Sequence, residues 1–179
     1  LAEAYNKTDF SWNMTTTFFM AHHVRTGVAN GAKAAAVAAL PIVSKETEPL
    51  VNSPKSMMVT QYKWGENSEP LTVVNIHGLN FLGRKALIRQ LHQADRVLEK
   101  INGPILFAGD FNTHTSDHLN AVDAYMSKWN LKRHLWPRDH RDVTRDHVYS
   151  RGLKIVTSRL YENLKSSDHP LLWIKVEAE

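Results

Sequence analysis

Carboxylate, amide and imidazole side chains flank four apolar runs of the sequence. Asn75 and His77 end LTVVNIHGLN, Asp110 and Asn112 end PILFAGDFN, Asp146 and His147 begin DHVYSRGL, and Asp168 and His169 precede PLLWIKV. Each pair alone fits an ordinary turn, because Asp and Asn side chains hydrogen-bond to their own backbone. Four such pairs in one chain predict a one-sided polar cleft where the ends of several strands meet.

The residue types in these pairs suit the hydrolysis of a phosphate ester. That reaction needs a hard divalent cation held by carboxylates, a base that orients the attacking water, and donors for the phosphoryl oxygens. Positioning and charge stabilisation then dominate the chemistry. Asp110 is the candidate base, with Asn112 and the histidines as donors. A carboxylate beside His169 would fix the tautomer and charge of that imidazole.

Apolar patterning predicts the strands that must carry these side chains. Strands are expected at residues 10–24, 56–64, 71–81, 104–111, 146–153 and 169–177. Residues 31–44 form a small-residue segment, which we interpret as a buried strand rather than a helix because of its length and its proline. The candidate site residues therefore lie at strand ends.

Two helices are expected between these strands. Apolar residues recur at spacings of three and four from Leu87 to Ile101, which predicts a helix over residues 83–101 that Asn102, Gly103 and Pro104 end. A second helix is expected over residues 116–129, with Ser116 or Asp117 as its cap. Hairpin-spaced strands with few helices predict an α+β layered sheet protein.

Length and composition indicate one globular domain over residues 1–179. The 42% apolar and 22% charged fractions are ordinary for such a domain. No apolar run approaches the roughly 20 residues that span a bilayer, so no membrane span is expected. The absence of cysteine excludes disulfides, zinc–thiolate sites and cysteine catalysis. It leaves the compartment open, and we favour a cytoplasmic location.

The positive charge is concentrated in one segment. The net charge is +4, and residues 128–151 alone carry an excess of four positive charges. This pattern predicts either an anionic partner or a solvated basic face. Trp129 and Trp136 in the same segment could stack on nucleobases, or they could pack in the core.

Four of the motifs, in their order and spacing, carry a resemblance to a known family. They are NIHGLN (residues 75–80), AGDFN (108–112), DHVYSRG (146–152) and SSDHPLL (166–172). The chain resembles the endonuclease/exonuclease/phosphatase superfamily, the DNase I-like group, and within it a set of bacterial members. That group includes apurinic endonucleases, inositol-polyphosphate 5-phosphatases and neutral sphingomyelinases. The resemblance implies a DNase I-like two-layer β-sandwich flanked by helices.

The resemblance also implies roles for individual residues. Glu3, in LAEA, and Asp168 would bind Mg²⁺ or Mn²⁺, with Asp168 also able to orient His169. His77 and Asn80 would contact the scissile phosphate, Asp110 would activate water, and Asn112 would hold phosphate or metal. Asp146 would pair with a catalytic histidine or bind a second cation, and His169 would stabilise the transition state. The family's first strand and its asparagine have no counterpart before Glu3, so the chain is interpreted as N-terminally truncated.

Several substrates and one non-catalytic role remain open at this level. A metal-dependent nuclease acting on phosphodiester bonds of nucleic acid is favoured, because of the basic, tryptophan-containing segment. The alternatives are a phosphomonoesterase, a lipid or inositol-phosphate phosphatase, and a non-catalytic binding module. His114 and His118 are spaced like zinc ligands, but no third ligand follows at matching spacing, so they are interpreted as a surface pair.

Overall fold

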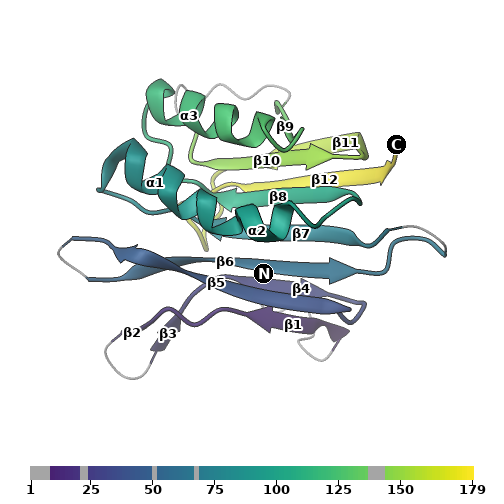
Figure 1. Ribbon diagram of the computed structural model, residues 1–179, viewed down its shortest axis with the longest axis horizontal. Helices are drawn as coiled ribbons and strands as arrows, with labels where there is room; N and C mark the ends of the chain where they lie inside the picture. The colour runs from purple at the N-terminus through teal and green to yellow at the C-terminus, as the bar shows by residue number, and fades with distance from the viewer. Residues whose placement is uncertain (1–8, 21–23, 50–51, 67–68, 137–143) are drawn as a thin grey trace.

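The computed structural model describes residues 9–20, 24–49, 52–66, 69–136 and 144–179 of the chain (Figure 1). Its strands are β1 (Ser11–Met14), β2 (Phe18–Met20), β3 (Val24–Thr26), β4 (Ala29–Ala32), β5 (Ala38–Thr47), β6 (Pro54–Tyr62), β7 (Leu71–His77), β8 (Ile105–Asp110), β9 (Lys132–Arg133), β10 (Asp146–Arg151), β11 (Leu153–Tyr161) and β12 (Leu171–Ala178). Its helices are α1 (Gly83–Leu91), the 3-10 turn η3 (His92–Ala94), α2 (Asp95–Leu98) and α3 (Ser116–Ser127). None of the described helices is both long and apolar enough to cross a membrane.

A six-stranded mixed sheet forms the centre of the fold. Its strand order is β5-β6-β7-β8-β10-β9, and β7 runs parallel to β8 while the other neighbours are antiparallel. A parallel pair needs a crossover connection, and α1, η3 and α2 supply it between β7 and β8. The parallel pairing brings the ends of β7 and β8 to the same edge of the sheet.

The two faces of this sheet have different partners. Helix α1 contacts α3 and β5 on one face, where the core includes Val74, Ile76 and Phe107, all buried (Figure 1). β1 contacts β6, and β4 contacts both β6 and β7. Since side chains alternate along a strand, Asn75 and His77 point away from the face that buries Val74 and Ile76. The site residues of β7 therefore lie on the face opposite the helices.

The segment at residues 31–44 corrects one expectation. A strand is present there, as predicted, but its burial was predicted wrongly, because most of β5 is exposed and Leu40 is 45% exposed. The reason is its position: β5 is the edge strand and pairs only with β6 among the described strands. The small residues that indicated burial are instead tolerated at an open edge.

The helices also differ in detail from the patterning. The helix expected over residues 83–101 is interrupted by η3, although its apolar stripe is buried as predicted. Helix α3 begins at Ser116, and its cap is Thr115, whose Oγ1 accepts a hydrogen bond from the backbone N–H of His118 at 3.3 Å. The caps expected at Ser116 and Asp117 are therefore wrong by one residue or two. Strand β11 was not predicted, because the exposed hairpin that it forms with β12 lacks a continuous apolar run.

Candidate active site

Three of the predicted site residues lie side by side across adjacent strands. His77 at the end of β7 is in register with Asp110 at the end of β8, and Asp110 is in register with Asp146 at the start of β10. In-register residues on neighbouring strands point to the same face and lie close together. The sheet therefore gathers an imidazole and two carboxylates in one row at its edge.

Asp110 occupies the centre of this row, and its two oxygens have different surroundings. Oδ1 accepts a hydrogen bond from the backbone N–H of Asn112 at 2.8 Å, which fixes the rotamer of the side chain. Oδ2 lies 3.8 Å from Nε2 of His77 and 3.9 Å from Nε2 of His169. The side chain is 19% exposed, so Oδ2 can be reached by water between the two imidazoles.

His169 is held by Asp146 from the strand on the far side of Asp110. Its Nδ1 lies 3.0 and 2.9 Å from the two carboxylate oxygens of Asp146. This hydrogen bond raises the pKa of His169, because the neighbouring carboxylate favours the protonated imidazole. The contact orients the ring so that Nε2 lies 3.9 Å from Oδ2 of Asp110. Asp146 is thus the carboxylate that the sequence predicted beside His169.

His77 has the opposite electrostatic character. Its half-buried position lowers its pKa, and the positive charge of Lys55 lowers it further. Lys55 reaches this position from β6, where the next residue, Ser56, is in register with His77. The site therefore combines one imidazole that favours its neutral form with one that favours its charged form.

Asn80 is oriented by contacts that leave its amide group as a donor. Its Oδ1 accepts hydrogen bonds from the backbone N–H of Phe81 at 2.9 Å and from Nε2 of His114 at 2.7 Å. With both contacts on the oxygen, Nδ2 remains available to donate to an anion. His114 was interpreted from its spacing as part of a surface pair, but it is half-buried and supports Asn80. It precedes α3, so it does not share a helical face with His118.

A buried ion pair anchors the loop that carries Asn80. The carboxylate of Glu48 is 5% exposed; one oxygen accepts the backbone N–H of Asn80 at 2.8 Å and the other lies 3.3 Å from Nζ of Lys55. Gln90 of α1 holds the same loop by accepting from the N–H of Leu79 at 2.7 Å. Sequence patterning missed Glu48, because the polar segment KETEP (residues 45–49) indicates a solvated turn. It missed Lys55 as well, because nothing in the neighbouring sequence signals burial of a lysine.

The backbone around Asp110 depends on the close approach of β7 and β8 and of the segments that follow them. Gly109 has a φ of 137°, and a Cβ there would lie 2.1 Å from the carbonyl oxygen of Ile76. Beyond the strand, Nδ2 of Asn112 donates to the carbonyl of Gly78 at 2.8 Å, and Gly78 N–H donates to the carbonyl of Asp110 at 2.7 Å. The buried Asn112 therefore links the segment after β8 to the segment after β7 through this hydrogen bond.

The predicted metal ligands are only partly placed. Glu3 lies outside the described residues, and Asp168 has an exposed side chain directly before His169. Asp110 and Asp168 offer carboxylate oxygens, the donors that Mg²⁺ prefers. Within the described ranges, however, no group of three His, Cys, Asp or Glu side chains is arranged to hold a metal ion. The donor chemistry fits a hard cation, whereas the described ligand set is too small to bind one by itself.

The aromatic residues of the basic segment are not free to stack. Trp136 is buried at 9% exposure, and Trp129 packs against the hydrophobic core. Arg151 donates to the backbone carbonyls of Trp129, Ile101 and Gly103. Its guanidinium group is therefore engaged within the protein. The interpretation that the tryptophans pack in the core is confirmed. Part of the basic segment, residues 137–143, lies outside the described part of the chain.

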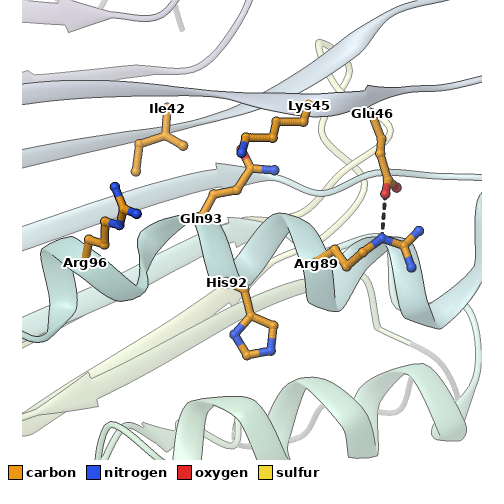
Figure 2. A pocket seen from close by; sticks show the side chains of 7 residues that line it. All are labelled: Ile42, Lys45, Glu46, Arg89, His92, Gln93 and Arg96. Atoms are coloured by element: carbon orange, nitrogen blue, oxygen red, sulfur yellow. Dashed lines mark hydrogen bonds and ion pairs between the residues drawn. The ribbon is translucent and has the colours of Figure 1, made fainter.

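A basic groove lies between the edge strand β5 and the crossover helices α1, η3 and α2. It has a volume of about 590 Å³ and is lined by Ile42, Lys45, Glu46, Arg89, His92, Gln93 and Arg96. Figure 2 shows Lys45 and Glu46 on β5 facing Arg89 and Arg96 on the helices, with Arg89 donating to Glu46. One wall of the groove is therefore the exposed strand β5, and the other includes α1, which begins at Gly83, three residues after Asn80.

Comparisons with known proteins place the sequence in a family context. The profile of the Endonuclease/Exonuclease/phosphatase family matches residues 2–169. A UPF0294 protein of Vibrio campbellii is 36% identical over 152 residues, which are 82% of this chain and 53% of that protein. The chain therefore spans about half the length of that curated relative.

Solved structures share the fold at low sequence identity. An endonuclease/exonuclease/phosphatase family protein from Leptotrichia buccalis has a TM-score of 0.72 at 17% identity, covering 98% of this chain and 74% of that one. The human Nocturnin catalytic domain, solved with a bound sulfate, has a TM-score of 0.73 at 15% identity, covering 97% and 74%. The expected DNase I-like α+β sandwich is confirmed by these likenesses.

Proposed function

Because the chain belongs to the endonuclease/exonuclease/phosphatase family, we propose that it hydrolyses phosphodiester bonds in nucleic acid. Members of this superfamily are hydrolases that act on phosphate esters. The observation that carries the proposal is the position of Oδ2 of Asp110, within 3.9 Å of Nε2 of both His77 and His169. A partly exposed carboxylate between two imidazoles suits the activation of water beside a phosphate.

In this reaction Asp110 orients and deprotonates the attacking water. The water binds at Oδ2, its oxygen forms a bond to phosphorus, and the bond to the leaving oxygen breaks on the opposite side. The proton passes to Asp110, whose Oδ1 stays fixed by the Asn112 N–H. The leaving oxygen takes a proton from solvent or from a protonated histidine. General-base assistance of this kind contributes about 10² to 10⁴-fold in rate.

Two donors neutralise the charge that develops on the phosphoryl oxygens. His169, whose protonated form Asp146 favours, donates from Nε2, and Asn80 donates from Nδ2. Both groups are held in place by other side chains before substrate binds, so little reorganisation is needed in the transition state. His77 favours its neutral form and supplies a further contact to the phosphate.

We also propose that the reaction depends on a divalent cation. The superfamily is generally divalent-metal dependent. Asp168, together with Glu3 outside the described residues, would hold Mg²⁺ or Mn²⁺, which when bound would neutralise charge on the scissile phosphate. The roles of Asp110, His169 and Asn80 follow from their own contacts and do not require a particular position for the ion.

A substrate panel with matched variants tests this function. The full-length protein is incubated with a single-stranded oligonucleotide, duplex DNA, a phosphomonoester, an inositol phosphate and a phospholipid, with Mg²⁺ or with EDTA. The proposal predicts cleavage of nucleic acid that EDTA abolishes and that His169→Ala reduces. Turnover confined to the monoester, the inositol phosphate or the phospholipid would contradict the nuclease proposal while retaining the phosphoesterase class.

A further inference from the structure

We propose that Phe81 and a basic stripe along α1, η3 and α2 form a track for single-stranded nucleic acid that leaves the active site. The inference rests on the proposed function and extends it, because it names the form of the substrate and the residues that hold it away from the scissile bond. The nucleotide nearest the site stacks on Phe81. The following phosphates contact Lys85, Arg89 and Arg96, with Lys45 across the groove.

Phe81 is placed for contact with a substrate and contributes nothing to the core. Its side chain is 77% exposed, the largest exposure among the described large apolar residues. Its φ is 63°, a conformation that is costly for a bulky residue, and its N–H donates to Oδ1 of Asn80. Phe81 thus has a strained backbone, an exposed ring and a position next to Asn80, the proposed phosphate donor. This combination suits stacking of the ring on a nucleobase.

The basic stripe begins at Lys85, five residues beyond Asn80, and continues along α1 over the helix-covered face of the sheet, away from the site. Lys85, Arg89 and Arg96 are separated by four and seven residues, which keeps them on one side of a helical path. Arg89 and Arg96 line the groove together with Lys45 of β5 (Figure 2). Lys85 and Arg89 are about 6 Å apart along α1 at 1.5 Å per residue, and η3 and α2 carry the stripe on to Arg96.

Most of these cations lack carboxylate partners. Arg89 pairs with Glu46, but within the described part of the chain no carboxylate lies within ion-pair distance of Lys45, Lys85 or Arg96. The first turn of α1 also contains no acidic residue and no side-chain cap. Unpaired cations on both walls of a groove complement a polyanion. A groove between one helix and one strand suits a single flexible strand better than a rigid duplex.

The length dependence of cleavage tests the stripe. We would measure kcat/KM for a dinucleotide and for an eight-nucleotide single strand, in wild type and in the double variant Lys45→Ala/Arg96→Ala, over a range of salt concentrations. In wild type the longer strand should be preferred, and the double variant should lower that preference about 10-fold. The slope of log kcat/KM against log salt for the longer strand should fall by about 1.4, or 0.7 for each lost phosphate contact.

The control variant Lys154→Ala/Lys175→Ala removes two exposed cations from β11 and β12, and it should change neither quantity. The track proposal would be overturned by any of three results. They are an equal loss of kcat/KM in the control and the track variant, no length preference in wild type, and a preference for a duplex of the same sequence. Failure of wild type to cleave any of these substrates would instead contradict the proposed function. The two failures are therefore distinguishable.

Phe81→Asn tests the stacking role without risk to folding. Asn tolerates a positive φ, so the variant should unfold at the same or a higher temperature than wild type. Its kcat/KM should fall about 5- to 100-fold for a single strand, and little for the same strand with an abasic site beside the scissile bond. Phe81→Tyr should restore the activity. Equal losses on both strands, or no loss on either, would exclude stacking.

Discussion

The imidazole of His169 is held by the carboxylate of Asp146, whose two oxygens lie 3.0 and 2.9 Å from Nδ1. The two residues are 23 positions apart in the sequence, and the contact forms because β10 begins beside the end of β8 and the segment before β12 folds over the same edge. The carboxylate raises the pKa of His169. The proton that we assign to transition-state stabilisation is therefore retained to higher pH than in an isolated histidine.

Asp146→Asn should change the pH dependence of catalysis. Without the carboxylate, the pKa of His169 falls toward its ordinary value, so the loss of activity on the alkaline side should begin at a lower pH. Near pH 8, where an imidazole with an ordinary pKa of about 6.5 is only about 3% protonated, we expect kcat to fall by up to about 30-fold, with a smaller loss near pH 6. The measurement is the pH profile of kcat for wild type and variant. An alkaline limb at the same pH in both would show that His169 does not act in its protonated form.

His77→Gln should change the pH dependence of stability in the opposite sense. The pKa of His77 is lowered in the folded protein by partial burial and by Lys55, so protonation is harder in the folded than in the unfolded state. His77 therefore contributes stability above pH about 6.5, the unfolded value, and that contribution is lost as the pH falls through the lowered folded pKa. Between pH 7 and 5, urea denaturation should show a smaller loss of unfolding free energy in the variant than in wild type.

Glu48→Ala should destabilise the protein and loosen the loop that carries Asn80. The substitution leaves Lys55 without its partner in a largely buried position, and breaking such a pair costs about 3–5 kcal/mol. Glu46→Ala is the matched control, because its pair with Arg89 is exposed and should contribute at most about 1 kcal/mol. Urea denaturation measures both variants. Similar losses in the two would mean that the Glu48 pair is no more important than a surface contact.

Gly109→Ala should disrupt the sheet beside Asp110. The φ of 137° is strained for any other residue, and the new Cβ would collide with the carbonyl of Ile76. Gly83→Ala is the comparison, because Gly83 also has a positive φ, of 73°, but open space around it. We expect Gly83→Ala to cost about 1 kcal/mol and Gly109→Ala several times more, as measured by thermal unfolding. Equal effects would indicate that contact with Ile76 is not limiting.

The sequence predicted the row of site residues because the information for it is local. An apolar, β-branched run that ends in Asn75 and His77, or in Asp110 and Asn112, indicates both the strand and the polar group at its end. The expected contact between His169 and a carboxylate is present in the structure. The apolar stripe from Leu87 to Ile101, which packs α1 and α2 against the sheet, was likewise predicted from residue spacings of three and four.

Features that depend on tertiary closure could not be predicted in this manner. Glu48 becomes buried only when residues 78–82 fold against it, and the role of His114 depends on the position of Asn80. The exposure of β5 follows from its place at the sheet edge, which its small residues do not reveal. Likewise, Phe81 shows its strained backbone and free ring only in three dimensions.

The most direct test of the account is the activity of Asp110→Asn. The substituted amide can still accept the Asn112 N–H through Oδ1, so the fold should persist, and circular dichroism with thermal unfolding would check this. With a single-stranded oligonucleotide and Mg²⁺, we predict that kcat falls about 10² to 10⁴-fold while KM changes little. EDTA-sensitive cleavage at the wild-type rate by the folded variant would contradict the assignment of Asp110 as the residue that activates water.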